Sequence, residues 1–384
     1  MKDNTVVIIR SSFSAYGGVE KVVLDVLDAL IKNKVRVILL TSAPRSWPIA
    51  HPKLEIIPAG VGKGPRFLQA FLFNRGVTKF LKSQRQRPDC IFSFDRVMTF
   101  THLHGGGGTH RTFLKLKNAE SGFWSRQFRQ ASLFHNYTLY LEKKGFSNPL
   151  LKKIQCASSL VKQDIIRDYG VSREKLVLIP NSIDWPAIGE IFDHRHQIAA
   201  TLADRHGLDP RRSYLLFLGS GFERKGLDLA IRGITGLPAH YRLLIVGKGH
   251  RQPYETLAKR LACDRRIHFL GPQPEGWKYA ALCKALILPS RYEPFGVVCA
   301  EASAMGLPVL VSDRTGYVDW IQEGRNGVIL RFPATCGTIS EAFGRLLVMI
   351  ESSPLAPEKI RGESRCLDHG RVMNRLISDF LGFD

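Results

Sequence analysis

Two glutamates, Glu293 and Glu301, stand eight residues apart near the end of the chain. The apolar run 285–289 predicts a buried strand, and the Pro and Gly residues after it predict a turn into a helix that continues to Met305. One carboxylate therefore lies on the loop and the other on the helix. A pair of carboxylates in this arrangement can accept hydrogen bonds from the hydroxyl groups of a sugar and of a ribose.

The turn between the two glutamates supplies backbone donors as well. The N–H groups of Phe295, Gly296 and Val297 would lie in the first turn of the helix, where they have no partner within it. A helix N-terminus favours anionic or oxygen-rich ligands, so these three residues are candidates for substrate binding. The alternative is that the two glutamates are surface carboxylates at an ordinary helix start.

A second group of residues that could bind a substrate lies upstream. Arg224 and Lys225 follow a predicted strand at 215–218 and a loop that begins with Gly219. Arg can grip a phosphate with two parallel hydrogen bonds, and Lys adds a compact positive charge. The sequence has no Asp-x-Asp pair of the kind that metal-dependent transferases use. We therefore expect phosphate binding without a metal or other cofactor. The alternative is a solvated surface pair.

These motifs, together with the segment 302–311, resemble the retaining GT-B glycosyltransferases of family 4. The resemblance implies that Glu293 contacts the transferred hexose, that Glu301 binds the ribose of the nucleotide, and that Arg224 and Lys225 stabilise the leaving diphosphate. The segment 219–226 is further similar to bacterial lipopolysaccharide core glucosyltransferases. That similarity implies a UDP-sugar donor, glucose as the hexose, and a lipopolysaccharide core or similar phosphorylated glycolipid as the acceptor.

The N-terminal half begins with a predicted strand at 5–10, a loop that contains Gly17 and Gly18, and an amphipathic helix from about 20 to 31. Adjacent glycines allow the backbone to approach a ligand closely. In the family, this loop faces the donor phosphates, so Gly17 and Gly18 are candidate substrate-binding residues. A plain turn from strand to helix would also use Gly-Gly.

Four consecutive glycines at 105–108 lie between two histidines, His104 and His110. Ordering such a run costs considerable conformational entropy, which suggests a loop that backbone or substrate approaches closely. Because family members place an Asp or His near this position, we expect His104 or His110 to border the acceptor hydroxyl, with Asp95 as a lesser candidate. Each histidine could instead have a purely structural role.

The composition is that of a soluble globular enzyme, with 44% hydrophobic and 23% charged residues in a chain of 384. Seven cysteines are scattered without Cys-x-x-Cys spacing, which predicts a reducing compartment without disulfides or zinc. The first apolar stretch is too short for a signal peptide, and no apolar run reaches eighteen residues. We therefore expect a cytoplasmic protein that does not span a membrane.

The net charge of +21 is concentrated in the N-terminal half. Residues 1–182 carry 29 Lys and Arg against 12 Asp and Glu, whereas residues 183–384 carry 26 against 22. Two stretches that look helical, 63–87 and 111–153, combine basic residues with aromatic ones. Anionic lipid surfaces attract such segments, which predicts peripheral association with the inner membrane face. The alternatives are a surface that binds nucleic acid and an ordinary solvated basic surface. Of these interpretations we favour the lipid surface, and we expect no nucleic-acid partner.

Alternating strands and helices predict an α/β protein with parallel sheets. With the resemblance, this implies a GT-B fold of two Rossmann-like domains that face a central cleft. The expected divisions are an acceptor domain at 1–182, a nucleotide-sugar domain at 183–361, and a terminal helix at 362–384 that crosses back. Two rival functions remain: a sugar-nucleotide epimerase with the same fold and, less favoured, a nucleic-acid-binding protein.

Overall fold

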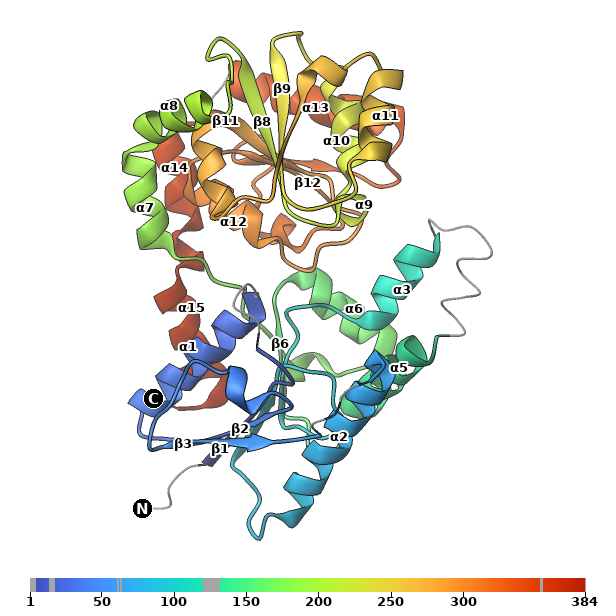
Figure 1. Cartoon of the computed structure of the whole chain (residues 1–384), viewed down its shortest axis with the longest axis vertical. Helices are drawn as coiled ribbons and strands as arrows, with labels where there is room; N and C mark the ends of the chain where they lie inside the picture. The colour runs from blue at the N-terminus through green and yellow to red at the C-terminus, as the bar shows by residue number, and fades with distance from the viewer. Residues whose placement is uncertain are drawn as a thin grey trace. The chain divides into compact units, whose positions relative to one another are not determined.

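A computed structural model describes residues 5–13, 18–60, 62, 64–119, 132–352 and 355–383. The chain divides into two compact units, which are treated separately below (Figure 1). Unit 1 comprises Met1–Pro180 and Met373–Asp384, and unit 2 comprises Asn181–Val372. The sequence-based division placed the boundary after residue 182 and the start of the returning segment at 362. The C-terminal segment of the chain thus belongs to the same unit as the N-terminus.

Unit 1 is built on a seven-stranded sheet in the order β3-β2-β1-β4-β5-β6-β7. All of its strand pairs are parallel. The central strands are apolar and buried on both faces, as expected for parallel strands that helices cover. The strands are β1 (Thr5–Ile9), β2 (Arg36–Thr41), β3 (Leu54–Pro58), β4 (Cys90–Ser93), β5 (His102–His104), β6 (Lys153–Cys156) and β7 (Leu176–Leu178).

Helices of unit 1 complete its core. α2, α3, α5 and α6 form one connected layer, whereas α1 packs with the C-terminal segment η7. The ring of Phe380 in η7 lies 5.5 Å from that of Phe92 in β4, which anchors the end of the chain on the sheet. The helical elements are α1 (Gly18–Lys32), α2 (Arg66–Ser83), α3 (His110–Ala119), α5 (Leu133–Phe146), α6 (Ser159–Tyr169) and the π-helical η7 (Leu376–Leu381). α15 (His369–Arg375) begins in unit 2 and ends in unit 1.

Unit 2 contains a six-stranded parallel sheet in the order β10-β9-β8-β11-β12-β13. α10, α11 and α13 pack together, and α12 packs with α7 and α14. The strands are β8 (Ser213–Leu218), β9 (Tyr241–Val246), β10 (Ile267–Gly271), β11 (Cys283–Leu288), β12 (Val309–Ser312) and β13 (Gly327–Leu330). The helices are α7 (Trp185–Asp193), α8 (Arg195–Arg205), α9 (Phe222–Lys225), α10 (Leu227–Ile234), α11 (Gln252–Arg260), α12 (Val297–Ala304), α13 (Cys336–Glu351) and α14 (Pro357–Glu363).

The α/β class and the two Rossmann-like domains predicted from the sequence are confirmed. Predicted strands at 5–10, 215–218 and 285–289 correspond to β1, β8 and β11, and the predicted helix at 20–31 corresponds to α1. All seven cysteines are free thiols. Within the described part of the chain, no helix combines the length and apolarity needed to cross a bilayer.

Each sheet has one place where the strand order reverses direction. In unit 1 it lies between β1 and β4, and in unit 2 between β8 and β11. Neighbouring crossovers leave such a point on opposite faces of the sheet, so the loops at the carboxyl ends of the two strands diverge and open a crevice that commonly binds ligands. In unit 2, Arg224, Lys225 and Glu293 follow these strands, and in unit 1 Asp95 follows β4, whereas His104 and His110 lie at the end of β5 and the start of α3.

Candidate active site

In unit 2, Arg224 and Lys225 converge on a single oxygen of Glu293. Arg224 Nη1 donates to Glu293 Oε2 at 2.8 Å, and Lys225 Nζ donates to the same oxygen at 3.0 Å. Arg224 Nη1 also donates to the carbonyl of Tyr292 at 3.0 Å. The contacts arise because α9 follows β8, the Glu293 loop follows β11, and the two strands are neighbours in the sheet. The structure thus brings the adjacent pair Arg224 and Lys225 together with Glu293, which lies 69 and 68 positions further along the chain.

Lys225 and Glu293 are largely buried, whereas Arg224 is partly exposed. The side chains of Lys225, Glu293 and Arg224 are 10%, 14% and 39% exposed. Burial by itself would raise the pKa of Glu293, but the charges of Lys225 and Arg224 and their hydrogen bonds outweigh it and lower that pKa below its usual value. Glu293 is therefore an anion at neutral pH and can only accept hydrogen bonds.

The turn after Glu293 leads into α12 as predicted. Gly296 is the residue before the helix, with a φ of 96° that favours glycine. No acceptor among the described residues takes a hydrogen bond from the N–H groups of Phe295, Gly296 or Val297. Glu301 is half-buried on the same helix. The side chain of Phe295 is a core residue, 1% exposed, so only its backbone remains available to a ligand.

A second loop holds Glu293 from the other side. The N–H of Glu293 donates to the carbonyl of Arg314 at 3.0 Å, and the N–H of Gly316 donates to the carbonyl of Glu293 at 2.8 Å. Ser312 Oγ, at the end of β12, lies 3.1 Å from Thr315 Oγ1 in the same loop. The backbone of Glu293 is thus fixed by the loop that follows β12.

Unit 1 carries a charged cluster at its own point of reversal. Arg10, directly after β1, donates to Asp95 at 2.9 Å and to Glu20 at 2.8 Å. The N–H of Ser11 also donates to Asp95. Asp95 is therefore committed to Arg10 and to the backbone. Gly18 is the first residue of α1, whereas Gly17 lies outside the described residues.

A cavity of about 200 Å³ adjoins this cluster. Its wall combines charged side chains with apolar ones. The residues that matter here are Arg10, Asp95, His104 and Glu142, with Phe94 and Leu141 on the apolar side. It is a small site with both polar and apolar surface inside unit 1.

His104 lies at the end of β5 and lines this cavity. Its Nδ1 pairs with Oε1 of Gln155. Since the amide nitrogen of Gln155 donates to the carbonyl of Ile179 at 3.1 Å, the amide oxygen faces His104, and Nδ1 carries the proton. Burial lowers the pKa of His104 to about 4. The imidazole is neutral at pH 7, with an unprotonated Nε2 that can accept a hydrogen bond.

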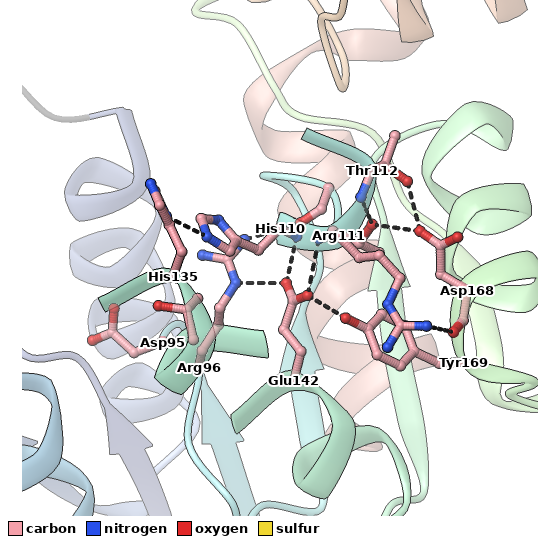
Figure 2. A network of polar contacts seen from close by, with 12 residues as sticks. Asp95, Arg96, His110, Arg111, Thr112, His135, Glu142, Asp168 and Tyr169 are labelled. Carbon is pink, nitrogen blue, oxygen red and sulfur yellow. Dashed lines mark hydrogen bonds and ion pairs between the residues drawn. The ribbon is translucent and has the colours of Figure 1, made fainter. Parts of the chain in front are cut away.

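His110 has a different environment. Its Nε2 lies 3.0 Å from Nδ1 of His135, and burial, followed by the charge of Arg96, lowers its pKa to about 4. Its backbone N–H donates to Glu142 at 2.6 Å. His110 is thus held by neighbours from both its ring and its backbone (Figure 2). Of the two predicted histidines, His104 lines the cavity of unit 1, whereas His110 is not among its lining residues.

Glu142 from α5 is the centre of the network in Figure 2. It accepts from Arg96 Nε at 2.7 Å, from the first N–H groups of α3, and from the hydroxyl of Tyr169. Asp168 at the end of α6 holds the same turn through Thr112 at 2.8 Å and Lys115 at 2.8 Å. Although burial opposes ionisation, these hydrogen bonds lower the pKa of Asp168 to about 2.

Close packing against the backbone accounts for Gly105, the first residue of the four-glycine run. Because Glu142 and Asp168 fix the start of α3, the glycine loop spans a short gap between β5 and an anchored helix. Gly105 has its backbone against Gln155: a Cβ at Gly105 would lie 2.4 Å from the carbonyl oxygen of Gln155. This close approach is to the protein's own backbone. Sequence reasoning missed Glu142 and Asp168 because neither lies near a recognisable motif.

Two parallel-sheet units in one chain, with the carboxylate and cation cluster at the carboxyl ends of one sheet, define the GT-B class of fold. Residues 16–185 match the model of Glycosyltransferase Family 4, and residues 200–349 match the model of Glycosyl transferases group 1. The chain therefore belongs to the family 4 glycosyltransferases of GT-B type. The resemblance inferred from the motifs is confirmed.

Among curated proteins, the chain is similar to the lipopolysaccharide glucosyltransferase WaaG of Escherichia coli, with 26% identity over 243 residues. The aligned region covers 62% of each chain, so the chain spans about three fifths of that relative's length. Among solved structures, the crystal structure of WaaG covers 98% of this chain and 100% of its own, with 20% identity and a TM-score of 0.75. Neither rival function is supported by the comparisons.

A further solved structure is that of HepE from Anabaena in complex with UDP and glucose. It is 14% identical to this chain, covers 98% of both chains, and has a TM-score of 0.66. At this level of identity the two solved structures establish the shared fold.

Proposed function

We propose that the protein is a retaining hexosyltransferase that moves glucose from UDP-glucose to a lipopolysaccharide core or similar phosphorylated glycolipid. The observation that carries the proposal is the convergence of Arg224 and Lys225 on Glu293 where the strand order of unit 2 reverses. The similarity to a lipopolysaccharide glucosyltransferase and to an enzyme that binds UDP and glucose supports the donor and the acceptor class.

Arg224 and Lys225 keep N–H groups that can donate hydrogen bonds to a diphosphate. Arg224 uses Nη1 for Glu293 and Tyr292, and the described residues offer no acceptor to its Nε or Nη2. Lys225 has three N–H donors, of which one reaches Glu293. Both side chains can therefore bind phosphate oxygens while Glu293 holds them in place. As the bond from the sugar to the phosphate breaks, they stabilise the charge that develops on the leaving group.

Glu293 and Glu301 orient the donor. Oε1 of Glu293 accepts from none of the described residues and is open to a hydroxyl of the hexose. The N–H groups at the start of α12 and the carboxylate of Glu301 on the same helix are suited to the phosphate and the ribose. Glu293 acts as an orienting anion. In the proposed reaction the acceptor oxygen bonds to the sugar on the face that the phosphate leaves, and its proton passes to the departing phosphate oxygen.

On the acceptor side, His104 is the residue best suited to meet a hydroxyl. Its unprotonated Nε2 can accept a hydrogen bond from a hydroxyl, its ring is fixed by Gln155, and it lines the cavity of unit 1. We propose no metal in the reaction, because Arg224 and Lys225 supply the positive charge that a metal would otherwise provide.

The acceptor class implies a membrane surface, and unit 1 has a face that suits one. Four of the five large hydrophobic side chains exposed in the described part of the chain lie on α2 and α5: Leu68, Phe71, Leu133 and Tyr140. The rings of Phe71 and Tyr140 each lie about 6 Å from Tyr137. α2 has no acidic residue, and Lys143 and Lys144 follow on α5. We propose that this face binds anionic lipid on the cytoplasmic side of the membrane.

The test is a thermal-shift panel of the protein with UDP, GDP, ADP and CMP and their common sugars, repeated with EDTA. A ligand that binds the folded protein raises its melting temperature by mass action. We expect UDP and UDP-glucose to stabilise the protein, with EDTA having no effect. Stabilisation by none of these nucleotides would contradict the assignment, and a shift abolished by EDTA would contradict metal independence.

A further inference from the structure

The guanidinium of Arg361 in α14 lies at the C-terminal end of α12, the helix that follows Glu293. Nη1 donates to the carbonyl of Ala304 at 2.7 Å, and Nη2 donates to the carbonyl of Trp185 at 3.1 Å. Arg361 is 9% exposed, and its guanidinium carbon lies 3.7 Å from the ring centre of Trp185 and 5.4 Å from that of Phe192. A buried guanidinium is costly unless its donors are satisfied, and here they bind helix carbonyls.

Two glycines make room for this arrangement. A Cβ at Gly189 in α7 would lie 2.4 Å from Nη2 of Arg361. A Cβ at Gly306, just after α12, would lie 2.6 Å from Cβ of Pro357 and 2.9 Å from Cε2 of Phe192. α7 and α14 therefore pack closely against the guanidinium at the C-terminal end of α12.

The same residue connects α12 to the segments by which the chain enters and leaves unit 2. α7 begins four residues after the unit starts, and α14 ends nine residues before it finishes. The N–H of Ile183 donates to the carbonyl of Leu367 at 3.0 Å, and the N–H of His369 donates to the carbonyl of Ile183 at 2.9 Å. Trp185 Nε1 lies 3.2 Å from Ser364 Oγ. The entering and leaving segments are thus paired, and Arg361 attaches α12 to that pair.

α12 is short and rigid enough to transmit this attachment. A helix of eight residues is about 12 Å long, so a tilt of about 5° about its C-terminal end would move its N-terminal end by about 1 Å. Its N-terminal end is the turn after Glu293, and its middle carries Glu301. Positions within about 1 Å matter for charge stabilisation at a reacting phosphate.

We propose that Arg361 is a positioning residue for the donor site. By fixing the C-terminal end of α12 against α7 and α14, it keeps the first turn of that helix aligned with Arg224 and Lys225. The inference rests on the proposed function for the identity of the ligand, a nucleoside diphosphate. Its structural part, the attachment of α12, does not depend on that function.

The test uses the full chain and three variants. R361A removes the guanidinium, R361K keeps a charge that can reach one carbonyl, and G189A leaves Arg361 intact but places a methyl group where Nη2 lies. Gly189 has an ordinary helical φ, so alanine there favours the helix and the variant should fold. The matched control is R365A, because Arg365 also lies over the Trp185 ring, at 5.6 Å, but is exposed.

Amide hydrogen exchange of α12 is measured first, without nucleotide. We expect exchange in α12 to be at least about tenfold faster in R361A and G189A than in the wild type, with α13 unchanged and R361K intermediate. R365A should match the wild type. Unchanged α12 exchange in folded R361K and G189A would overturn the inference, whether or not R361A folds.

UDP affinity by calorimetry supplies the second measurement. The dissociation constant should rise at least about tenfold in G189A and R361A, and partly recover in R361K. A lowered melting temperature with unchanged UDP affinity would reduce Arg361 to a stabilising residue and overturn its positioning role. If the wild type itself binds no UDP, the proposed function fails, and the exchange measurement still decides whether Arg361 holds α12.

Discussion

The side chain of Lys225 occupies the space that a side chain at Gly219 would need. A Cβ at Gly219 would lie 2.5 Å from Cε of Lys225 and 2.9 Å from its Nζ. Gly219 also has a φ of 133°, which residues other than glycine rarely adopt. Gly219 was predicted to bind substrate, and the structure gives it a further role, since its lack of a side chain lets Lys225 pass over the end of β8 to Glu293.

We expect Gly219→Ala to lower kcat/KM for the transferase reaction by at least about tenfold, because the methyl group displaces the ammonium from Glu293. Gly221→Ala is the control for backbone strain. Its φ of 77° is also unfavourable for alanine, but a Cβ there meets nothing within 4 Å. Equal losses in the two variants would mean that strain, and not the position of Lys225, explains the effect.

Arg224→Ala and Glu293→Gln should each reduce turnover by about 100-fold or more, since each removes a charge from the group that we propose faces the leaving diphosphate. Steady-state kinetics with UDP-glucose and circular dichroism would separate lost activity from lost folding. Arg211→Ala is the control, because that side chain is 87% exposed and pairs with Asp209 away from the site. Near-normal activity of either site variant would contradict the assignment.

Acid should destabilise unit 1 through His104. In the unfolded chain the imidazole has a pKa near 6.5, whereas in the folded protein burial lowers that pKa to about 4. The unfolded state therefore binds more protons below pH 6.5, and stability falls as the pH drops toward 4. His104→Asn should reduce the loss of unfolding free energy between pH 7 and pH 5 by about 2 kcal/mol. Urea denaturation at both pH values measures this difference, and identical losses in the variant and the wild type would argue against a buried neutral His104.

Glu142→Ala should destabilise unit 1 by about 3 kcal/mol. The change leaves the first N–H groups of α3 and the hydroxyl of Tyr169 without their acceptor. Urea denaturation followed by fluorescence measures the change in unfolding free energy. In the control Glu55→Ala, the lost ion pair with Arg36 is about half exposed, so the cost of that contact should stay below about 1 kcal/mol. A similar cost for both variants would show that the network in Figure 2 contributes little.

The double variant Phe71→Ser/Tyr140→Ser should weaken binding to vesicles that contain phosphatidylglycerol by about tenfold or more, because it removes two aromatic side chains from the proposed lipid-binding face. Val348→Ser is the matched control, since Val348 is exposed, at 60%, on α13 of unit 2. Co-sedimentation with anionic and with neutral vesicles measures the effect. Unchanged binding of the double variant, or equal binding to both kinds of vesicle, would contradict the proposed surface.

Local patterns predicted the elements that carry the site. The apolar runs before Gly219 and before Ser290 are buried strands, because parallel strands covered by helices must be apolar on both faces. The glycine-broken loop and the Pro-Phe-Gly turn marked where each strand ends, and so placed Arg224 and Glu293 at the same edge of a sheet. The fold class and family followed from these features.

The order of the strands was not predictable from those patterns, since every central strand has a similar apolar composition. Only the sheet shows that β8 lies beside β11 and that β1 lies beside β4. The sequence singled out His104 and His110 equally, and only the tertiary structure shows that His104 lines the cavity of unit 1 while the ring of His110 packs against His135.

By itself, the sequence determined that the chain has two parallel α/β domains, a carboxylate pair at a helix start, and an adjacent pair of cations. Tertiary structure alone decided that both cations meet one oxygen of Glu293, that Glu142 anchors α3, and that Arg361 holds α12. The physical reason is separation along the chain. Arg361 and Ala304 are 57 residues apart, and Arg224 and Glu293 are 69 apart, so their contacts depend on how sheets and helices pack and leave no local pattern.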